Sequence, residues 1–301
     1  MVGKLTSDAK LSASLAPVLM NQSHPTYGMS RNDLMARVLN AQGRGDFDVP
    51  EWTYNEAADH GNNLEGYIIT EAANRLGIEK FDKDITTVYD YDDLFSASLD
   101  GILFNERLTV GESEGIILMH PEHYYDGSNC MILQGNGIIE SKLTSASYTD
   151  TPPPYRGPWQ LQMQMLCHGA EWGVIATFYQ GTRLVLNIYE ADQEMQRQLI
   201  EAAKDFYQRL DGPDWYPALD GADAARTWER GEDHLPSVDL DPIAQVAMSY
   251  YEAKRAMKAA DELAKKLEPQ IMTHMANHEM AHLKDENGDV LFEFKWPTRN
   301  F

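Results

Sequence analysis

The spacing of apolar residues along the chain predicts several helices. Between residues 30 and 39 the apolar positions have helical spacing, Ser30 stands at the N-cap position, and Asp33 follows three residues later. Similar patterns predict helices over 55–76, 159–167 and 192–210. Near the C-terminus, a helix is predicted over 243–267, interrupted at Pro269 and resumed over 271–283.

Shorter apolar or alternating runs predict strands between these helices. They cover 85–89, 95–104, 137–143, 173–179, 184–189 and 290–296. The segment 105–137 is rich in glycine and turn residues and contains a short apolar run over 116–119, so an extended hairpin or insertion is predicted there. Strands interleaved with helices predict an α/β fold with a mixed central sheet.

The amino-acid composition of the sequence changes after Leu210. Residues 211–241 are acidic and rich in proline and glycine, which is typical of a linker or of an arm that lies along a surface. We therefore predict three parts: a core over 1–210, an acidic arm over 211–241, and C-terminal helices with a hairpin over 242–301.

Composition narrows the functional classes. A hydrophobic fraction of 43% excludes general disorder, no apolar run approaches the ~18 residues of a membrane span, and the first ten residues lack the apolar core of a signal peptide. The two cysteines, Cys130 and Cys167, are expected to be reduced thiols in the cytoplasm, and they are too few for a four-cysteine zinc or iron–sulfur site.

The formal net charge of -22 argues against non-specific binding of nucleic acid to the protein surface. It is compatible with a local basic track surrounded by repulsive surface. We predict that this track uses Arg31, Arg37, Lys142 and Arg156.

The residues with the clearest chemistry lie on two predicted strands. Asp100 is followed by Gly101, and Glu140-Ser141-Lys142 lies on a later strand, where Glu140 and Lys142 share a face because side chains alternate. Two carboxylates and an ammonium at one sheet edge suit metal-assisted phosphodiester hydrolysis. On these residues alone, an exposed Glu/Lys pair on an edge strand is the simpler interpretation, because the E-x-K pattern also occurs by chance.

Further motifs occur in a fixed order around these residues, and together they resemble the phage lambda exonuclease-like, YqaJ-type viral recombinase family of PD-(D/E)xK nucleases. In this sequence, Leu99 stands where the family usually has a proline before the aspartate. The resemblance covers about residues 11–210. The matching segments are Ser12 to Leu19, Gly61 to Glu65, Ser98 to Gly101, Glu140 to Lys142, and Gln160, Gln162, Gly169 and Trp172.

The resemblance implies a PD-(D/E)xK core that digests linear double-stranded DNA from its ends, 5′ to 3′. It further implies a single-strand annealing protein as partner, a ring-like homo-oligomer such as a trimer, and a phage or prophage source in the cytoplasm of a bacterial host. One or two Mg²⁺ or Mn²⁺ ions would be the cofactor.

The resemblance also assigns roles to individual residues. Asp100 and Glu140 would be metal ligands, with the backbone carbonyl of Ser141 as a further ligand. Lys142 would orient the attacking water as a base or act through its charge. Glu65 would help to bind metal, and Gln160 would position the nucleophile or the scissile phosphate.

Two other functions are compatible with the sequence. His278-Glu279-Met280-Ala281-His282 has the H-E-x-x-H spacing of zinc metalloproteases, which requires both histidines on one face of a helix. A chain this acidic could also be a non-catalytic DNA mimic or a protein-binding module.

Overall fold

The computed structural model of the chain describes residues 6–23, 28–49, 56–120, 129–212, 214–228, 239–276 and 278–295. The chain divides into two compact units, Met1–Arg230 and Gly231–Phe301. None of the helices in the described part is long and apolar enough to cross a membrane.

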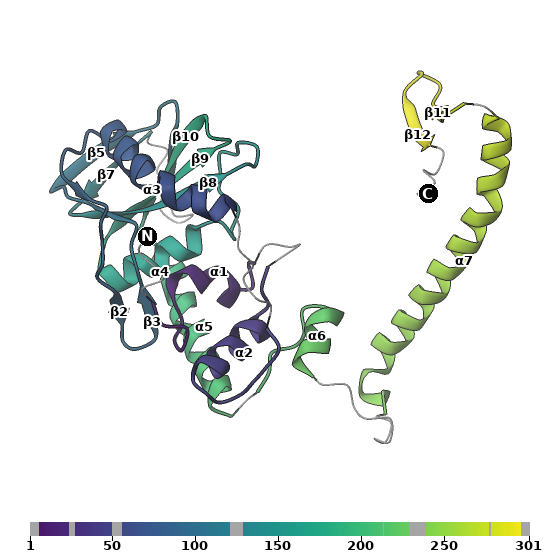
Figure 1. Cartoon of the computed structure of the whole chain (residues 1–301), viewed down its shortest axis with the longest axis horizontal. Helices are drawn as coiled ribbons and strands as arrows, with labels where there is room; N and C mark the ends of the chain where they lie inside the picture. Colours follow the sequence, from purple (N-terminus) through teal and green to yellow (C-terminus); the bar gives the residue numbers. More distant parts are fainter. Residues whose placement is uncertain are drawn as a thin grey trace. The chain divides into compact units, whose positions relative to one another are not determined.

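A six-stranded mixed sheet forms the centre of the first unit (Figure 1). Its order is β1-β4-β8-β9-β10-β6; β8 is parallel to β9, β10 is parallel to β6, and the other neighbours are antiparallel. The α/β prediction with a mixed sheet is confirmed. The strands are β1 (Phe81–Asp82), β4 (Gly101–Leu103), β6 (Ile116–Met119), β8 (Gly137–Thr144), β9 (Trp172–Tyr179) and β10 (Arg183–Glu190).

Two short ribbons flank this sheet. One pairs β2 (Tyr89–Tyr91) with β3 (Phe95–Ala97), and the other pairs β5 (Arg107–Gly111) with β7 (Cys130–Gln134). The predicted hairpin over 105–137 is therefore present as β5 and β7. The run over 116–119 leaves that hairpin and becomes the edge strand β6 of the main sheet.

Two of the predicted strands were placed wrongly. The strand predicted over 85–89 lies at 89–91, because Asp92 and Asp93 adopt positive φ angles and form the tight turn that sets the pairing of Tyr91 with Phe95. The strand predicted over 95–104 divides at Asp100 into β3 and β4, which belong to different sheets.

Helices cover both faces of the main sheet. The buried side chains Ile68, Ile69 and Ala72 of α3 join one hydrophobic cluster with Ile139 and Val174 of the sheet. On the opposite face, helices α1, α2, α4 and α5 form a second cluster. These helices are η1 (Ala13–Leu15), α1 (Ala16–Leu19), α2 (Arg31–Ala41), α3 (Glu56–Arg75), α4 (Pro158–His168) and α5 (Gln193–Asp211).

The first part of the acidic arm packs on α2. The side chain of Asn32 donates to the carbonyl of Tyr216 (3.0 Å) and accepts from its N–H (2.8 Å), and Tyr216 is buried. Helix α6 (Gly221–Thr227) follows, and its Asp223 accepts hydrogen bonds from Ser30 and Asn32. Residues 214–228 of the arm thus belong to the first unit, while the domain boundaries drawn from sequence remain a prediction.

The predicted cap of α2 is present and is extended by the arm. Ser30 and Asp33 form a capping box, and Arg226 of α6 donates two hydrogen bonds to the Asp33 carboxylate (2.8 and 3.0 Å). Burial alone would raise the pKa of Asp33, but the hydrogen bonds from Arg226 and from the Ser30 N–H outweigh it, so the pKa is lowered. Asp33 therefore stabilises the fold above its unfolded pKa of about 3.9, and this stability is lost as the pH falls below that value.

Replacing Arg226 with alanine is expected to destabilise the first unit by about 1.5–3 kcal/mol at neutral pH, because it removes charge-assisted hydrogen bonds to a buried carboxylate. Urea unfolding at several pH values measures this. The expected loss shrinks below pH ~4, where Asp33 becomes protonated first in the unfolded state and, at lower pH, in the folded state. Arg197→Ala is the control: its ion pairs with Glu194 and Glu201 are exposed, so its loss should stay within about 1 kcal/mol. Equal losses in both variants would contradict the role of Arg226.

The second unit consists of a short 3-10 helix, one long helix and a hairpin. These elements are η2 (Asp241–Ile243), α7 (Ala244–Met275), β11 (Met280–Lys284) and β12 (Val290–Lys295). Pro269 does not interrupt α7, so that prediction was wrong. The carbonyl of Pro269 accepts a hydrogen bond from the Thr273 hydroxyl (2.7 Å) within the helix.

The helix predicted over 271–283 was also wrong in its second half. Helix α7 ends at Met275, because Ala276 has a positive φ angle, and residues 280–284 form a strand. The predicted turn at Asn287-Gly288 is confirmed by the hydrogen bond from the Gly288 N–H to Asp285. The predicted strand over 290–296 is β12, and Trp296 lies outside the described residues.

Candidate active site

Two neighbouring strands bring Asp100 to the Glu140-Ser141-Lys142 segment. Asp100 directly precedes β4, and β4 pairs with β8 so that Gly101 lies opposite Ile139. The N–H of Ser141 donates to the Asp100 carboxylate (2.8 Å). A Cβ atom on Gly101 would come within 2.8 Å of the Ile139 side chain and 2.9 Å of the Asp82 carbonyl, so the glycine permits this close approach.

Glu140 is the centre of a hydrogen-bonded network. Only 3% of it is exposed, and its first carboxylate oxygen accepts from Lys142 Nζ (2.5 Å) and Gln160 Nε2 (2.7 Å). Its second oxygen accepts from Gln164 Nε2 (2.6 Å). Lys142 also donates to Gln160 Oε1 (3.1 Å), so Glu140, Lys142 and Gln160 bond to one another. The prediction that Glu140 and Lys142 share a face of their strand is confirmed.

The site holds more negative than positive charge. The pKa of Asp100 lies well above its ordinary value because of burial first, and then because of the charges of Glu140 and Glu65. The pKa of Glu65, on α3, is raised by burial and by Glu140. The structure therefore brings Glu65 within electrostatic reach of the strand residues, as a third carboxylate beside one lysine.

The site favours the charged form of Lys142, in contrast to its effect on Asp100 and Glu65. Burial alone would lower its pKa, but the carboxylates of Glu140 and Asp100 outweigh that effect and raise it. Lys142 is therefore an ammonium ion at neutral pH in this structure. A charged Lys142 favours the second of the two roles that the resemblance implies, in which the lysine acts through its charge.

The donor set fits a hard divalent cation in its chemistry. Carboxylate oxygens are the ligands that Mg²⁺ prefers, and the excess negative charge around Asp100 is what such an ion would offset. Among the described residues, no three acidic, histidine or cysteine side chains are grouped closely enough to hold an ion by themselves. Mg²⁺ typically binds through one or two carboxylates and keeps several waters, so Asp100 and Glu140 would suffice.

The three arginines predicted to contact DNA lie in different settings. Arg156 lies close enough to Lys142 for its charge to lower the pKa of that lysine, so it belongs to the neighbourhood of the site. Arg37 forms an ion pair with Asp8 (3.1 Å). Arg31 lies over the ring of Tyr216, with its guanidinium carbon 4.2 Å from the ring centroid.

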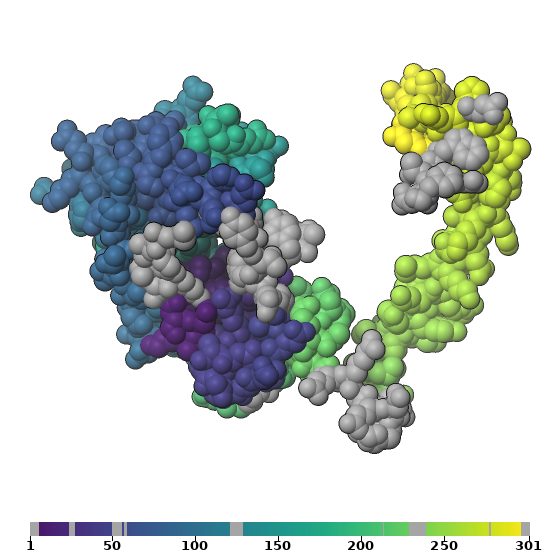
Figure 2. All heavy atoms as spheres, in the orientation of Figure 1, coloured from purple at the N-terminus to yellow at the C-terminus, as the bar shows by residue number. Residues whose placement is uncertain are grey.

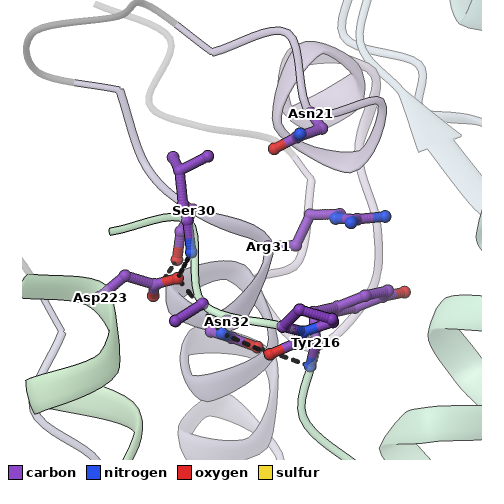
Figure 3. Close-up of a pocket in the computed structure, with 9 residues that line it drawn as sticks. Asn21, Ser30, Arg31, Asn32, Tyr216 and Asp223 are labelled. Atoms are coloured by element: carbon purple, nitrogen blue, oxygen red, sulfur yellow. Dashed lines mark hydrogen bonds between the residues drawn. The ribbon is translucent and has the colours of Figure 1, made fainter. Parts of the chain in front are cut away.

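Arg31 also lines a cavity of ≈ 240 Å³ between α2 and the arm. Figure 3 shows Ser30 and Asn32 turned toward Asp223 and Tyr216, with dashed hydrogen bonds between them. Because the polar groups along this wall bond one another, they serve mainly to attach the arm. The DNA-binding role of Arg31, Arg37 and Arg156 remains a prediction.

The structure overturns the zinc metalloprotease hypothesis. The H-E-x-x-H motif needs a helix to place its histidines one turn apart, but His282 lies in the strand β11 and His278 precedes it. His282 faces β12, where its Nε2 lies 3.2 Å from the Glu293 carboxylate. The described part of the chain contains no cluster of metal-binding side chains at this motif.

No family model and no curated protein matches the chain. Several solved structures are similar to it. An alkaline exonuclease from Laribacter hongkongensis has 18% identity over 69% of this chain and 90% of its own, with a TM-score of 0.47. Its complex with dAMP gives 18% identity over 69% and 91%, with a TM-score of 0.43. A phage-related exonuclease from Haemophilus somnus 129PT has 13% identity over 68% and 96%, with a TM-score of 0.42.

These neighbours are exonucleases. At such identities and TM-scores the similarity carries no argument about the family or the activity of this chain. The function proposed below therefore rests on the residues of the site.

Gln164 is a part of the site that was not found from the sequence. It is 1% exposed, and its Nε2 donates both to Glu140 (2.6 Å) and to the carbonyl of Ser98 (3.2 Å), two residues before Asp100. The family motif pairs Gln160 with Gln162, but residues four apart share a helix face, so Gln160 and Gln164 point to the same side. The i, i+4 spacing was the signal that could have revealed it.

Gln164→Met is expected to lower the rate of the hydrolysis proposed below by about tenfold or more while the fold persists, because Glu140 loses a fixed donor and the link to the Asp100 segment. Gln162→Met is the matched control on the same helix. The Gln162 side chain bonds the backbone at Glu190 and Asp192, so its loss should lower stability more than the activity of the folded protein. Activity per folded molecule, corrected by circular dichroism, distinguishes the two. A loss of activity that is no greater in Gln164→Met than in Gln162→Met would contradict the assignment.

Proposed function

We propose that this protein is a divalent-metal-dependent nuclease that hydrolyses phosphodiester bonds of linear double-stranded DNA. The observation that supports this most is the Lys142–Glu140–Gln160 network, with Asp100 and Glu65 within electrostatic reach. A structural ion pair needs one carboxylate for one ammonium. Three carboxylates around one lysine leave a negative excess that suits a cation and, through it, a phosphate.

Each residue has a distinct role in this proposal. Asp100 and Glu140 would hold the ion, with the Ser141 carbonyl and Glu65 as further contributors. When bound, the ion would polarise the scissile phosphate and lower the pKa of its water. The Lys142 ammonium stabilises the negative charge that develops on phosphorus oxygens, and the Gln160 amide holds that ammonium in place.

Net hydrolysis adds one water across one bond. The water oxygen bonds to phosphorus, the bond from phosphorus to the leaving sugar oxygen breaks, and that oxygen gains a proton. The order of the motifs further supports action from DNA ends, 5′ to 3′, within phage-type recombination beside an annealing protein. Arg156 is the best placed of the three arginines to guide a DNA strand.

The test uses linear duplex DNA labelled at either 5′ or 3′ ends and carrying 5′-phosphate or 5′-hydroxyl groups. The full chain is expected to release the label in Mg²⁺ or Mn²⁺ and to stop in EDTA. Covalently closed circular DNA is the control for end dependence. Failure to cut any of these substrates in either metal would overturn the proposal in favour of a non-catalytic acidic module.

A further inference from the structure

Helix α7, the long helix of the second unit, carries exposed apolar side chains. Val246, Tyr250 and Met257 are 67%, 64% and 65% exposed, which is far more than apolar side chains of a globular core. In Figure 2 the side chains of α7 form a single column, and within this unit only the hairpin lies beside its C-terminal end. A helix with an apolar stripe ordinarily buries it against another element.

The apolar residues of α7 follow a heptad repeat. Beginning at Val246, they recur in alternating steps of four and three residues up to Ile271, and each of these positions is apolar. This spacing of 3.5 residues is the pattern of a coiled-coil seam. The exposed apolar residues Met248, Tyr251 and Leu263 lie outside the seam. The first series of positions is Tyr250, Met257, Ala264 and Ile271, and the second is Val246, Ala253, Ala260 and Leu267.

The remaining positions of α7 lie on the two flanks of the seam and on the outer face. Lys254, Asp261 and Glu268 occupy one flank, the other flank carries no charge, and Pro269 lies on the face opposite the seam, where the bond it cannot donate does not disturb the seam. The helix carries five basic residues (Lys254, Arg255, Lys258, Lys265 and Lys266) and four acidic ones (Glu252, Asp261, Glu262 and Glu268). In a chain of net charge -22, this nearly neutral helix is a segment on which two copies can meet without strong repulsion.

We propose that α7 pairs with α7 of a second copy of this chain in an antiparallel coiled coil. The 32-residue helix is about 48 Å long at 1.5 Å per residue, which provides several layers of contact. In the antiparallel arrangement centred between Lys258 and Ala259, Met257 meets Ala260 of the other copy, and Tyr250 meets Leu267. At the centre, the large Met257 side chain thus pairs with the small Ala260, and farther out two large side chains meet.

The charges that flank the seam favour the antiparallel pair of α7 helices over a parallel pair. In the antiparallel pair, the flanking residue Lys254 faces Asp261 of the other copy, and the two-fold axis repeats this contact. Both residues are exposed in the single chain, where Asp261 pairs with Lys265 of the same helix (2.6 Å) and would be shared between the two lysines. In a parallel pair Lys254 would face Ser249 and Asp261 would face Ala256, so no opposite charges would meet.

The first test compares two methionines of α7 by sedimentation of the full chain over a range of concentrations. Met257→Glu places a charge in the seam and is expected to weaken self-association at least about tenfold. Met248→Glu makes the same change on the outer face, where Met248 is 57% exposed, and is expected to have no effect. Circular dichroism and nuclease activity report folding of the rest of the chain. Equal association in the two variants, or no concentration-dependent association of the wild type, would overturn the proposal.

A charge exchange tests the direction of pairing. Lys254→Asp and Asp261→Lys each place like charges opposite each other in the antiparallel pair, so each is expected to weaken association severalfold. The double variant restores opposite charges and is expected to recover wild-type association. Failure of the double variant to recover would exclude the antiparallel pair.

Discussion

Lys142→Met is expected to lower the rate of DNA hydrolysis by a factor on the order of 10²–10³, which is the cost of removing one preorganised charge from a transition state. Methionine keeps most of the length of the side chain and removes the ammonium. The expected loss lies in kcat, because the charge of the lysine matters most when negative charge develops on the phosphate. Single-turnover digestion of labelled duplex in saturating metal measures it.

Two variants control for effects on the fold. Lys204→Met makes the same change at an exposed position of α5 and is expected to leave activity unchanged. Lys142→Arg keeps the positive charge next to Glu140, so it should preserve stability while a planar guanidinium replaces the compact ammonium. Near-normal hydrolysis by a folded Lys142→Met protein would remove the lysine from the mechanism.

Asp100→Asn is expected to separate activity from stability. The raised pKa of Asp100 means that the folded state disfavours its charge, so folded-state stability decreases as the pH rises from the unfolded pKa of the carboxyl to its folded value. Asparagine removes that charge and can still accept the Ser141 N–H. We therefore expect a higher melting temperature in metal-free buffer together with loss of hydrolysis.

The same variant tests the metal ligand. Mg²⁺ should raise the melting temperature of the wild type, because a ligand that binds only the folded state stabilises it, and should raise that of Asp100→Asn much less. A shift of about 2–4 °C corresponds to about 1 kcal/mol for a unit of this size. Asp93→Asn, at a fully exposed carboxylate that pairs with Lys10, is the control and should keep the metal response. An unchanged response in Asp100→Asn would argue against Asp100 as a ligand.

Local patterns predicted part of this site. Alternation along a strand is enough to place Glu140 and Lys142 on one face, because the period of a strand does not depend on its neighbours. The contact between Asp100 and Ser141 requires β4 to pair with β8 in one register, and no local pattern specifies that register. In this case, the order of motifs in the resemblance supplied what periodicity could not.

The errors near the C-terminus have a physical cause. The segment after Met275 is short, and its apolar residues suit either a helix or a strand. Hydrogen bonding to β12 stabilises this segment as the strand β11, and β12 lies beyond the Asn287-Gly288 turn. An interior proline removes one hydrogen bond from a helix. Helix α7 is long enough to continue through Pro269 without that bond.

The attachment of the arm to α2 changes where this protein can be divided. A fragment that ends at Leu210, where composition changes, would lack Tyr216, Asp223 and Arg226, and would leave the polar groups of Ser30, Asn32 and Asp33 exposed or unpaired. A shortened form of the protein meant for crystallisation or for assays without the C-terminal unit should therefore retain the chain through Trp228. The acidic arm holds the first helices of the first unit in place and also connects that unit to the second one.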